Sequence, residues 1–172
     1  MIDSVSGILK EKEPTRIVIE AGGIGYEIFI PFSTYEKLPS VDSSAKVLTH
    51  LVHRELAMEL FGFSMKKERD LFRLLLGISG IGPRVALAVL SGMAVDEFLK
   101  AVAAGESRYL TKINGVGKKK ADRIVLELGD KISDIQVDKK EEVSGSEEAR
   151  KVLLALGYKE ADIDKALKKI AS

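Results

Sequence analysis

Two stretches of the sequence, ISGIGPRVALAVL at residues 78–90 and INGVGKKKADRIV at residues 113–125, are copies of one pattern. The copies are offset by 35 residues, and each places an apolar residue between two glycines directly before a further apolar stretch. Glycine tolerates positive φ angles and has no side chain to block close approach. Ala86 and Ala121 occupy matching positions and are small enough for close helix packing. Each copy therefore predicts two helices joined by a tight hairpin.

Each predicted hairpin is expected to form an anion site. Because the second helix begins just after the glycines, its unpaired N–H groups and the positive end of its dipole face outward. Such a site suits a nucleic-acid phosphate and does not read base sequence. The pattern is that of the helix-hairpin-helix motif, and two tandem copies resemble the paired form that grips both backbones of a duplex. The candidate phosphate-binding residues are Gly80, Ile81, Gly82 and Arg84 in the first copy, and Gly115, Val116, Gly117, Lys118, Lys119, Lys120 and Arg123 in the second.

The lysines of the second copy favour this interpretation. Lys118, Lys119 and Lys120 fall in the first turn of the predicted helix, where cations oppose the helix dipole. A bound phosphate would remove that conflict, and such local conflicts are typical of functional sites. The alternative is an ordinary turn between helices with a glycine cap and a solvated lysine face.

Charge is distributed unevenly along the chain. The 172 residues hold 27 Lys and Arg against 26 Asp and Glu, a net charge of +1. Residues 1–63 have 6 basic and 9 acidic side chains, residues 64–131 have 13 and 8, and residues 132–172 have 8 and 9. Only the middle segment therefore has an excess suited to phosphate.

The first 63 residues are predicted to form a small β-barrel. In the first three of five short segments, apolar residues alternate with polar ones at period two, as half-buried strands require. Five strands in this length favour the closed barrel of OB type over other small antiparallel barrels, which remain an alternative. A short helix is predicted at residues 32–38. The predicted strands are residues 5–9, 16–20, 26–30, 46–52 and 57–63.

The rest of the chain divides by composition. Residues 64–132 have helical periodicity and form the predicted helix-hairpin-helix domain. Residues 133–145 lose the apolar pattern and are predicted to be a flexible linker. Residues 146–172 contain short amphipathic helices, and a module this small is expected to work against a partner surface. The predicted fold class is thus α+β multidomain.

Several kinds of chemistry are not expected. The chain has no cysteine, which excludes disulfides and thiolate sites. Lys112 and Lys119 stand where a P-loop requires glycine and Ser/Thr, so no nucleotide-hydrolysing site of that kind is predicted. His50 and His53 have few acidic neighbours, and no metal site is predicted there. With no catalytic constellation, signal peptide or membrane-spanning run, we expect a cytoplasmic, non-enzymatic protein without a cofactor.

The whole chain resembles the RuvA family, the Holliday-junction-binding subunits of bacterial RuvAB branch-migration complexes. The order of barrel, tandem hairpins, linker and small helical module carries the resemblance. Its most specific stretches are GGIGYEI (22–28), HRELAMELFGF (53–63), GISGIGPRVALAVLSGM (77–93), INGVGKKKADRIVLEL (113–128) and LLALGY (153–158).

The resemblance implies a homotetramer that holds a four-way DNA junction open and square, as one tetramer or as an octamer of two. It implies a role in recombination, DNA repair and the SOS response. The partners would be the hexameric ATPase RuvB, which uses ATP and Mg²⁺, and the resolvase RuvC. The C-terminal module would be a three-helix, UBA-like module that docks on RuvB through Leu153, Leu156 and Tyr158.

The resemblance also implies an acidic pin at the centre of the tetramer. In the family, two adjacent acids between the last two barrel strands repel phosphates at the crossover. Here Glu55 matches the first acid, whereas Leu56 replaces the second. The pin would therefore be weaker, unless Glu59 contributes.

Two alternatives to junction binding remain. One is a generic duplex-binding module without preference for junctions. The other is a helix-hairpin-helix glycosylase or nuclease, which needs a Lys or Asp beyond the hairpin in a base-flipping pocket. Asp122 is the available acid, but it falls within the predicted helix, where no surrounding helices would form a pocket.

Overall fold

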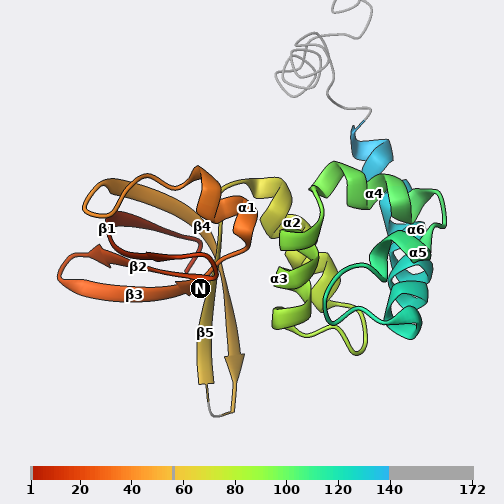
Figure 1. Cartoon of the computed structure of the whole chain (residues 1–172), viewed down its shortest axis with the longest axis horizontal. Coiled ribbons are helices and arrows are strands. Elements are labelled where there is room, and N and C mark those ends of the chain that lie inside the picture. Colours follow the sequence, from red (N-terminus) through yellow and green to blue (C-terminus); the bar gives the residue numbers. More distant parts are fainter. Residues whose placement is uncertain (1, 56, 140–172) are drawn as a thin grey trace, which may run out of the picture. The chain divides into compact units, whose positions relative to one another are not determined.

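The computed structural model describes residues 2–55 and 57–139 (Figure 1). Residues up to Asp130 form one compact unit. Its first half contains β1 (Ser4–Glu13), β2 (Arg16–Ala21), β3 (Ile24–Phe29), α1 (Phe32–Lys37), β4 (Ser44–Arg54) and β5 (Ala57–Phe63). Its second half contains α2 (Lys66–Leu76), α3 (Pro83–Gly92), α4 (Val95–Ala103), α5 (Ser107–Leu110) and the start of α6 (Lys118–Lys139).

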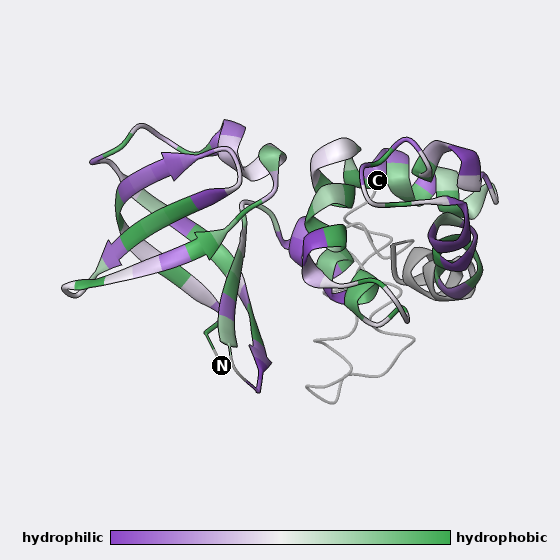
Figure 2. Cartoon of the chain, turned by 60° about the horizontal axis from the view of Figure 1, so that its bottom comes forward, coloured by the Kyte–Doolittle hydropathy of each residue, from purple (hydrophilic) through white to green (hydrophobic). Residues whose placement is uncertain are grey.

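The five strands close into a barrel in the order β1-β2-β3-β5-β4. Neighbouring strands are antiparallel except β3 and β5, which pair in parallel at Phe29 and Phe61. The predicted five-stranded, OB-like barrel is therefore confirmed, and so is the short helix after the third strand. Hydrophobic and hydrophilic residues are interspersed along the strands (Figure 2), and in β2 burial follows period two, with Ile17 and Ile19 inside.

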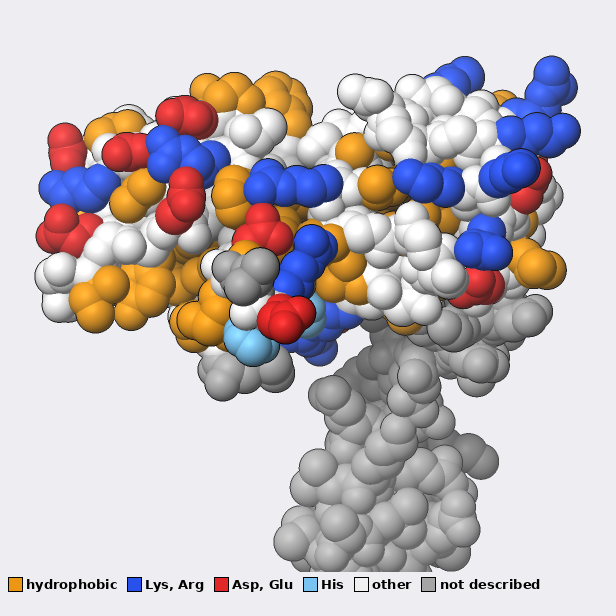
Figure 3. Space-filling view, turned by 90° about the horizontal axis from the view of Figure 1, so that it is seen from below, with side chains coloured by type: hydrophobic (Ala, Val, Ile, Leu, Met, Phe, Trp, Pro, Cys, Tyr) orange, Lys and Arg blue, Asp and Glu red, His pale blue; other side chains and the backbone are white. Residues whose placement is uncertain are grey.

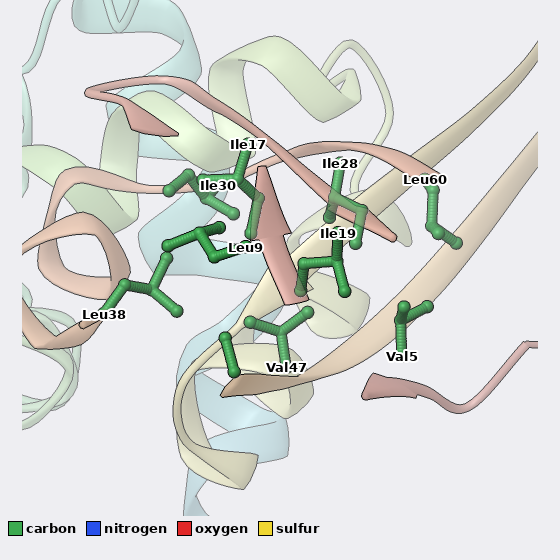
Figure 4. Close-up of a cluster of buried hydrophobic side chains, with 10 residues drawn as sticks. Val5, Leu9, Ile17, Ile19, Ile28, Ile30, Leu38, Val47 and Leu60 are labelled. Carbon is green, nitrogen blue, oxygen red and sulfur yellow. The ribbon is translucent and has the colours of Figure 1, made fainter. Parts of the chain in front are cut away.

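Aliphatic side chains from every strand fill the barrel (Figure 4). Leu9, Ile17, Ile19, Ile28 and Val47 are fully buried. Each such side chain contributes about 1.5–3 kcal/mol of transfer free energy relative to exposure. The barrel therefore has a core of its own and can support extensions that lack one.

One such extension is the ribbon formed by the ends of β4 and β5, which reaches away from the rest of the barrel (Figure 1). Its pairing continues from Leu51 with Leu60 to Arg54 with Ala57. Glu55 follows directly after this last pair and is exposed. The ribbon thus carries Glu55 to its far end.

An aromatic and polar junction attaches the barrel to α2. Phe72 is fully buried, and its ring centroid lies 5.1 Å from that of Phe61 and 4.9 Å from that of Phe63. Beside it, the buried Glu68 carboxylate accepts hydrogen bonds from the hydroxyls of Ser33, Thr34 and Ser64 and from the Met65 N–H. These contacts connect α1, the barrel and the first helical hairpin.

The helical part differs from the predictions in two ways. Helix α4 was not predicted, although Val95, Phe98 and Val102 have helical spacing. Helix α6 continues to Lys139, so residues 133–139 of the predicted flexible linker are helical. Residues 130–139 contain neither glycine nor proline, so nothing there interrupts the backbone hydrogen bonding. The remainder of the predicted linker and the predicted module at residues 146–172 lie outside the described residues.

Candidate nucleic-acid interface

The two glycine hairpins have the same backbone geometry. Gly80 and Gly115 adopt φ angles of +83° and +82°. The Ile81 N–H donates to the Ile78 carbonyl at 3.1 Å, and the Val116 N–H donates to the Ile113 carbonyl at 3.0 Å. The repeat seen in the sequence is therefore a repeat in three dimensions.

Buried apolar side chains hold each hairpin in place. Ile81 and Val116, the residues between the glycines, are only 5% and 2% exposed. Ala86 and Ala121 are fully buried behind them, as their small size suggested. The two residues predicted to touch phosphate between the glycines, Ile81 and Val116, can therefore do so only through the backbone.

The helix that follows each hairpin begins where an anion site requires it. The Ala86 N–H donates to the Gly82 carbonyl and the Ala121 N–H donates to the Gly117 carbonyl, both at 3.0 Å. In the second copy the Lys120 N–H also donates to the Gly117 carbonyl, at 3.0 Å. The N–H groups ahead of these bonds lack partners within the helix. A Cβ atom on either Gly82 or Gly117 would meet no protein atom within 4 Å, so this backbone is open to a ligand. Pro83 removes one donor from the first copy.

The lysines of the second hairpin have different surroundings. Lys118 and Lys119 are exposed, and their ammonium groups make no hydrogen bond or ion pair with the described part of the chain. The Lys120 ammonium instead donates to the Gly115 carbonyl at 3.1 Å. Lys118 and Lys119 are thus available to a phosphate, whereas Lys120 stabilises its own hairpin.

Arg123 connects the two hairpins. Its Nη1 donates to the Ser79 carbonyl of the first hairpin at 3.1 Å, and its Nε lies 3.8 Å from the Glu127 carboxylate. The side chain is 51% exposed, so part of the guanidinium still faces solvent. Sequence reasoning assigned Arg123 to phosphate alone and missed this contact between the copies.

Arg84 has partners in the barrel. Its Nη2 lies 3.0 Å from a Glu59 carboxylate oxygen, and its guanidinium carbon lies 4.0 Å from the centroid of the Phe29 ring. The side chain is nevertheless 63% exposed and keeps donors for a ligand. Glu59 lies within β5 and is already paired with this cation. Glu55, at the end of the ribbon, has no partner in the described part of the chain. Leu56 lies outside the described residues.

The remaining predicted sites have separate outcomes. Asp122 is exposed, and its carboxylate accepts a 2.6 Å hydrogen bond from the Ser107 hydroxyl. It therefore joins α5 to α6 on the surface. The predicted docking residues Leu153, Leu156 and Tyr158 lie outside the described residues.

The distribution of charge on the surface agrees with the charge counts of the sequence segments. Acidic side chains gather over the barrel, and the helical end of the same face is mainly basic (Figure 3).

In the described part of the chain, no helix combines the length and apolar character needed to cross a membrane.

Comparisons with known proteins match this arrangement along the chain. Residues 1–62 match the family model for the RuvA N terminal domain, residues 72–130 the SAM-like helix-hairpin-helix tandem, and residues 144–172 the RuvA C-terminal domain. Three similar proteins are each named "Holliday junction branch migration complex subunit RuvA". The protein of Haemophilus ducreyi is 45% identical over 99% of this chain and 90% of its own length. That of Idiomarina loihiensis is 42% identical over 100% and 92%, and that of a Polaromonas species 43% over 98% and 89%.

Proposed function

The chain belongs to the RuvA family, and from this premise we propose that it binds four-way DNA junctions as a homotetramer. It holds the junction open and square and serves as a subunit of a branch-migration complex in recombination and DNA repair. The observation that carries the proposal is the pair of matching hairpins, each with a buried apolar residue and an open helix N-terminus.

The hairpins supply capture by charge and shape. Phosphates of one duplex arm bind the N–H groups after Gly82 and Gly117, and Lys118 and Lys119 add charge beside the second site. Displaced counterions give this binding its salt dependence. Because the contacts are to backbone, different sequences are held alike.

The barrel supplies repulsion at the crossover. Glu55 lies at the end of the ribbon, exposed and without a partner in the described part of the chain. In a fourfold tetramer, four such carboxylates meet at the centre and repel the crossover phosphates. Glu59 contributes less to this pin, because its charge is offset by Arg84 at 3.0 Å.

We further propose that the chain is a non-catalytic subunit without a cofactor and acts in the cytoplasm. A RuvB-type hexameric ATPase supplies the motor and uses ATP and Mg²⁺, and a RuvC-type resolvase is a further partner. Residues 146–172 are the proposed motor-docking module. Deleting them should preserve junction binding and abolish stimulation of the ATPase; stimulation that survives would refute the docking assignment.

The decisive experiment for junction binding is a gel-shift competition. A labelled four-way junction is challenged with unlabelled junction or with linear duplex of the same sequences and total length. We expect the junction to compete far better than the duplex. Equal competition by linear duplex would leave only the generic duplex-binding function, and incision of damaged duplex would support an enzyme instead.

A further inference from the structure

The surface of α5 beside the second hairpin has a basic and aromatic character that junction capture by the hairpins does not use. Arg108, Tyr109, Thr111 and Lys112, here called the α5 surface, are all exposed. Tyr109 is 48% exposed, which is high for so large an aromatic side chain. The Lys112 ammonium lies 5.2 Å from the centroid of the Tyr109 ring, a cation–π contact that positions its charge.

Two adjoining hollows connect this surface to the hairpin. The first, of about 410 Å³, is lined by all four residues of the α5 surface. The second, of about 460 Å³, is lined by Ser107, Arg108, Thr111 and Lys118. Because Arg108 and Thr111 line both, the two hollows lie side by side, one beside Lys118 of the phosphate site and the other beside Lys112.

The charged residues that line the two hollows are basic. Arg108, Lys112 and Lys118 line them, and no acidic residue of the described part of the chain does. One acid is close by, because the Asp122 carboxylate accepts a hydrogen bond from the Ser107 hydroxyl, and Ser107 lines the second hollow. The three cations outnumber this acid, and a polyanion in the hollows would reduce their mutual repulsion.

The first copy of the repeat provides an internal control. At the positions 35 residues earlier, Tyr109 corresponds to Leu74, Lys112 to Gly77 and Lys118 to Pro83, whereas Arg108 corresponds to Arg73 and is a cation in both copies. The first copy forms the same hairpin with these residues. Hence the hairpin fold does not require the aromatic ring or the cations at positions 109, 112 and 118, and their presence in the second copy points to a ligand.

We infer that the α5 surface is an additional DNA-backbone contact, which follows the strand onward from the second hairpin. Arg108 and Lys112 contact phosphates beyond the one held at Gly117 and Lys118, and Tyr109 positions the Lys112 ammonium. The inference rests on the proposed DNA-binding function. It implies that each chain contacts a longer stretch of one DNA arm than the hairpins alone would.

The test compares two variants that each lose two positive charges. Arg108→Gln with Lys112→Gln removes them from the α5 surface, and Lys10→Gln with Lys46→Gln removes them from exposed positions on the barrel. Affinity of the full chain for a four-way junction is measured over a series of salt concentrations. Each lost phosphate contact reduces the slope of log affinity against log salt by about 0.9, so the first variant should lose about 1.8 and the second nothing.

Three results would overturn the inference. An unchanged slope in the α5 variant, while Lys118→Ala with Lys119→Ala lowers it, would refute the α5 contact alone. Equal slope losses in the α5 and barrel variants would reduce the effect to net charge. If the double variant unfolds, Lys112→Gln alone is used, and a slope loss well below about 0.9 is the contrary result.

A second readout separates the inference from the proposed function. If the α5 surface extends along the arm, the wild-type chain should gain affinity as the arms of the junction are lengthened, and the α5 variant should gain less. If the wild-type chain binds linear duplex with the same affinity as the junction, but the α5 variant still loses salt slope, the α5 contact is supported and the junction preference is refuted.

Discussion

Gly115 and Gly117 allow the two roles of a hairpin glycine to be separated. They lie two residues apart, both are exposed, and a Cβ atom on either would meet no protein atom within 4 Å. They differ in backbone conformation, because Gly115 has a φ of +82° and Gly117 has no positive φ. Replacing each with alanine therefore tests conformation at one position and access at the other.

Gly115→Ala should destabilise the fold without a steric clash. A non-glycine residue in the left-handed region costs about 1–2 kcal/mol. The hairpin cannot relax freely, because Val116 is buried and its N–H is bonded to Ile113. Gly117→Ala should leave stability unchanged or raise it by up to about 1 kcal/mol, since alanine restricts the unfolded chain.

The expected order reverses for DNA binding. A methyl group on Gly117 would stand where a phosphate approaches the open N–H groups. Loss of one charge-assisted hydrogen bond costs about 1.5–3 kcal/mol, or roughly a 10- to 100-fold loss of junction affinity. Gly115→Ala should reduce affinity less, provided that binding is measured where the variant is folded.

Urea unfolding and junction gel shifts measure the two effects. With a slope of about 1–3 kcal/mol per molar urea, the Gly115→Ala midpoint should fall by roughly 0.3–2 M at constant slope. Equal destabilisation by both substitutions would refute the conformational reasoning. Wild-type junction affinity in Gly117→Ala would refute the placement of the phosphate.

Three further predictions concern the contacts around the hairpins. Arg123→Met should lower the free energy of unfolding, measured with urea, by about 0.5–1 kcal/mol, because the half-exposed hydrogen bond to Ser79 is lost. Arg123→Lys keeps the positive charge, so it should be as destabilised as Arg123→Met but should retain the wild-type salt slope of DNA binding in a salt titration. Glu68→Leu should cost about 3 kcal/mol in the same unfolding assay, because it leaves the buried Thr34 hydroxyl and the half-buried Ser33 and Ser64 hydroxyls without their acceptor. Burial and the charge of Arg73 lower the pKa of His50 in the folded chain from 6.5. As the pH falls, the imidazole is therefore protonated at a higher pH in the unfolded chain than in the folded chain, which favours unfolding. Thermal stability should decline from neutral to mildly acid pH more steeply in the wild-type chain than in His50→Gln.

Local signals in the sequence accounted for the hairpins and the barrel. Positive φ at Gly80 and Gly115 follows from the glycine spacing, and the burial of Ile81 and Val116 follows from the apolar position between the glycines. Period-two alternation located β1, β2 and β3, and all five predicted strands are present. These features depend on residues within a few positions of one another, which is the range that a pattern can report.

Contacts between residues that are far apart in the chain could not be predicted from sequence patterns. Arg84 meets Glu59 across 25 residues, and Arg123 meets Ser79 across 44. Neither pair has a periodicity that would connect its members. The repeat predicted a helix before the second hairpin, and α5 lies there, but its four residues are too few for helical periodicity to define its bounds.

These distant contacts change how the positive charge of the hairpin domain should be counted. Lys120 and Arg123 each donate to a hairpin carbonyl, and Arg84 faces Glu59. Only Lys118 and Lys119, among the five basic residues predicted to bind phosphate, have no such partner in the described chain. The salt dependence of DNA binding should therefore follow the cations that remain unpaired, rather than the total charge of the domain, because a cation already paired in the free protein displaces fewer counterions when DNA binds.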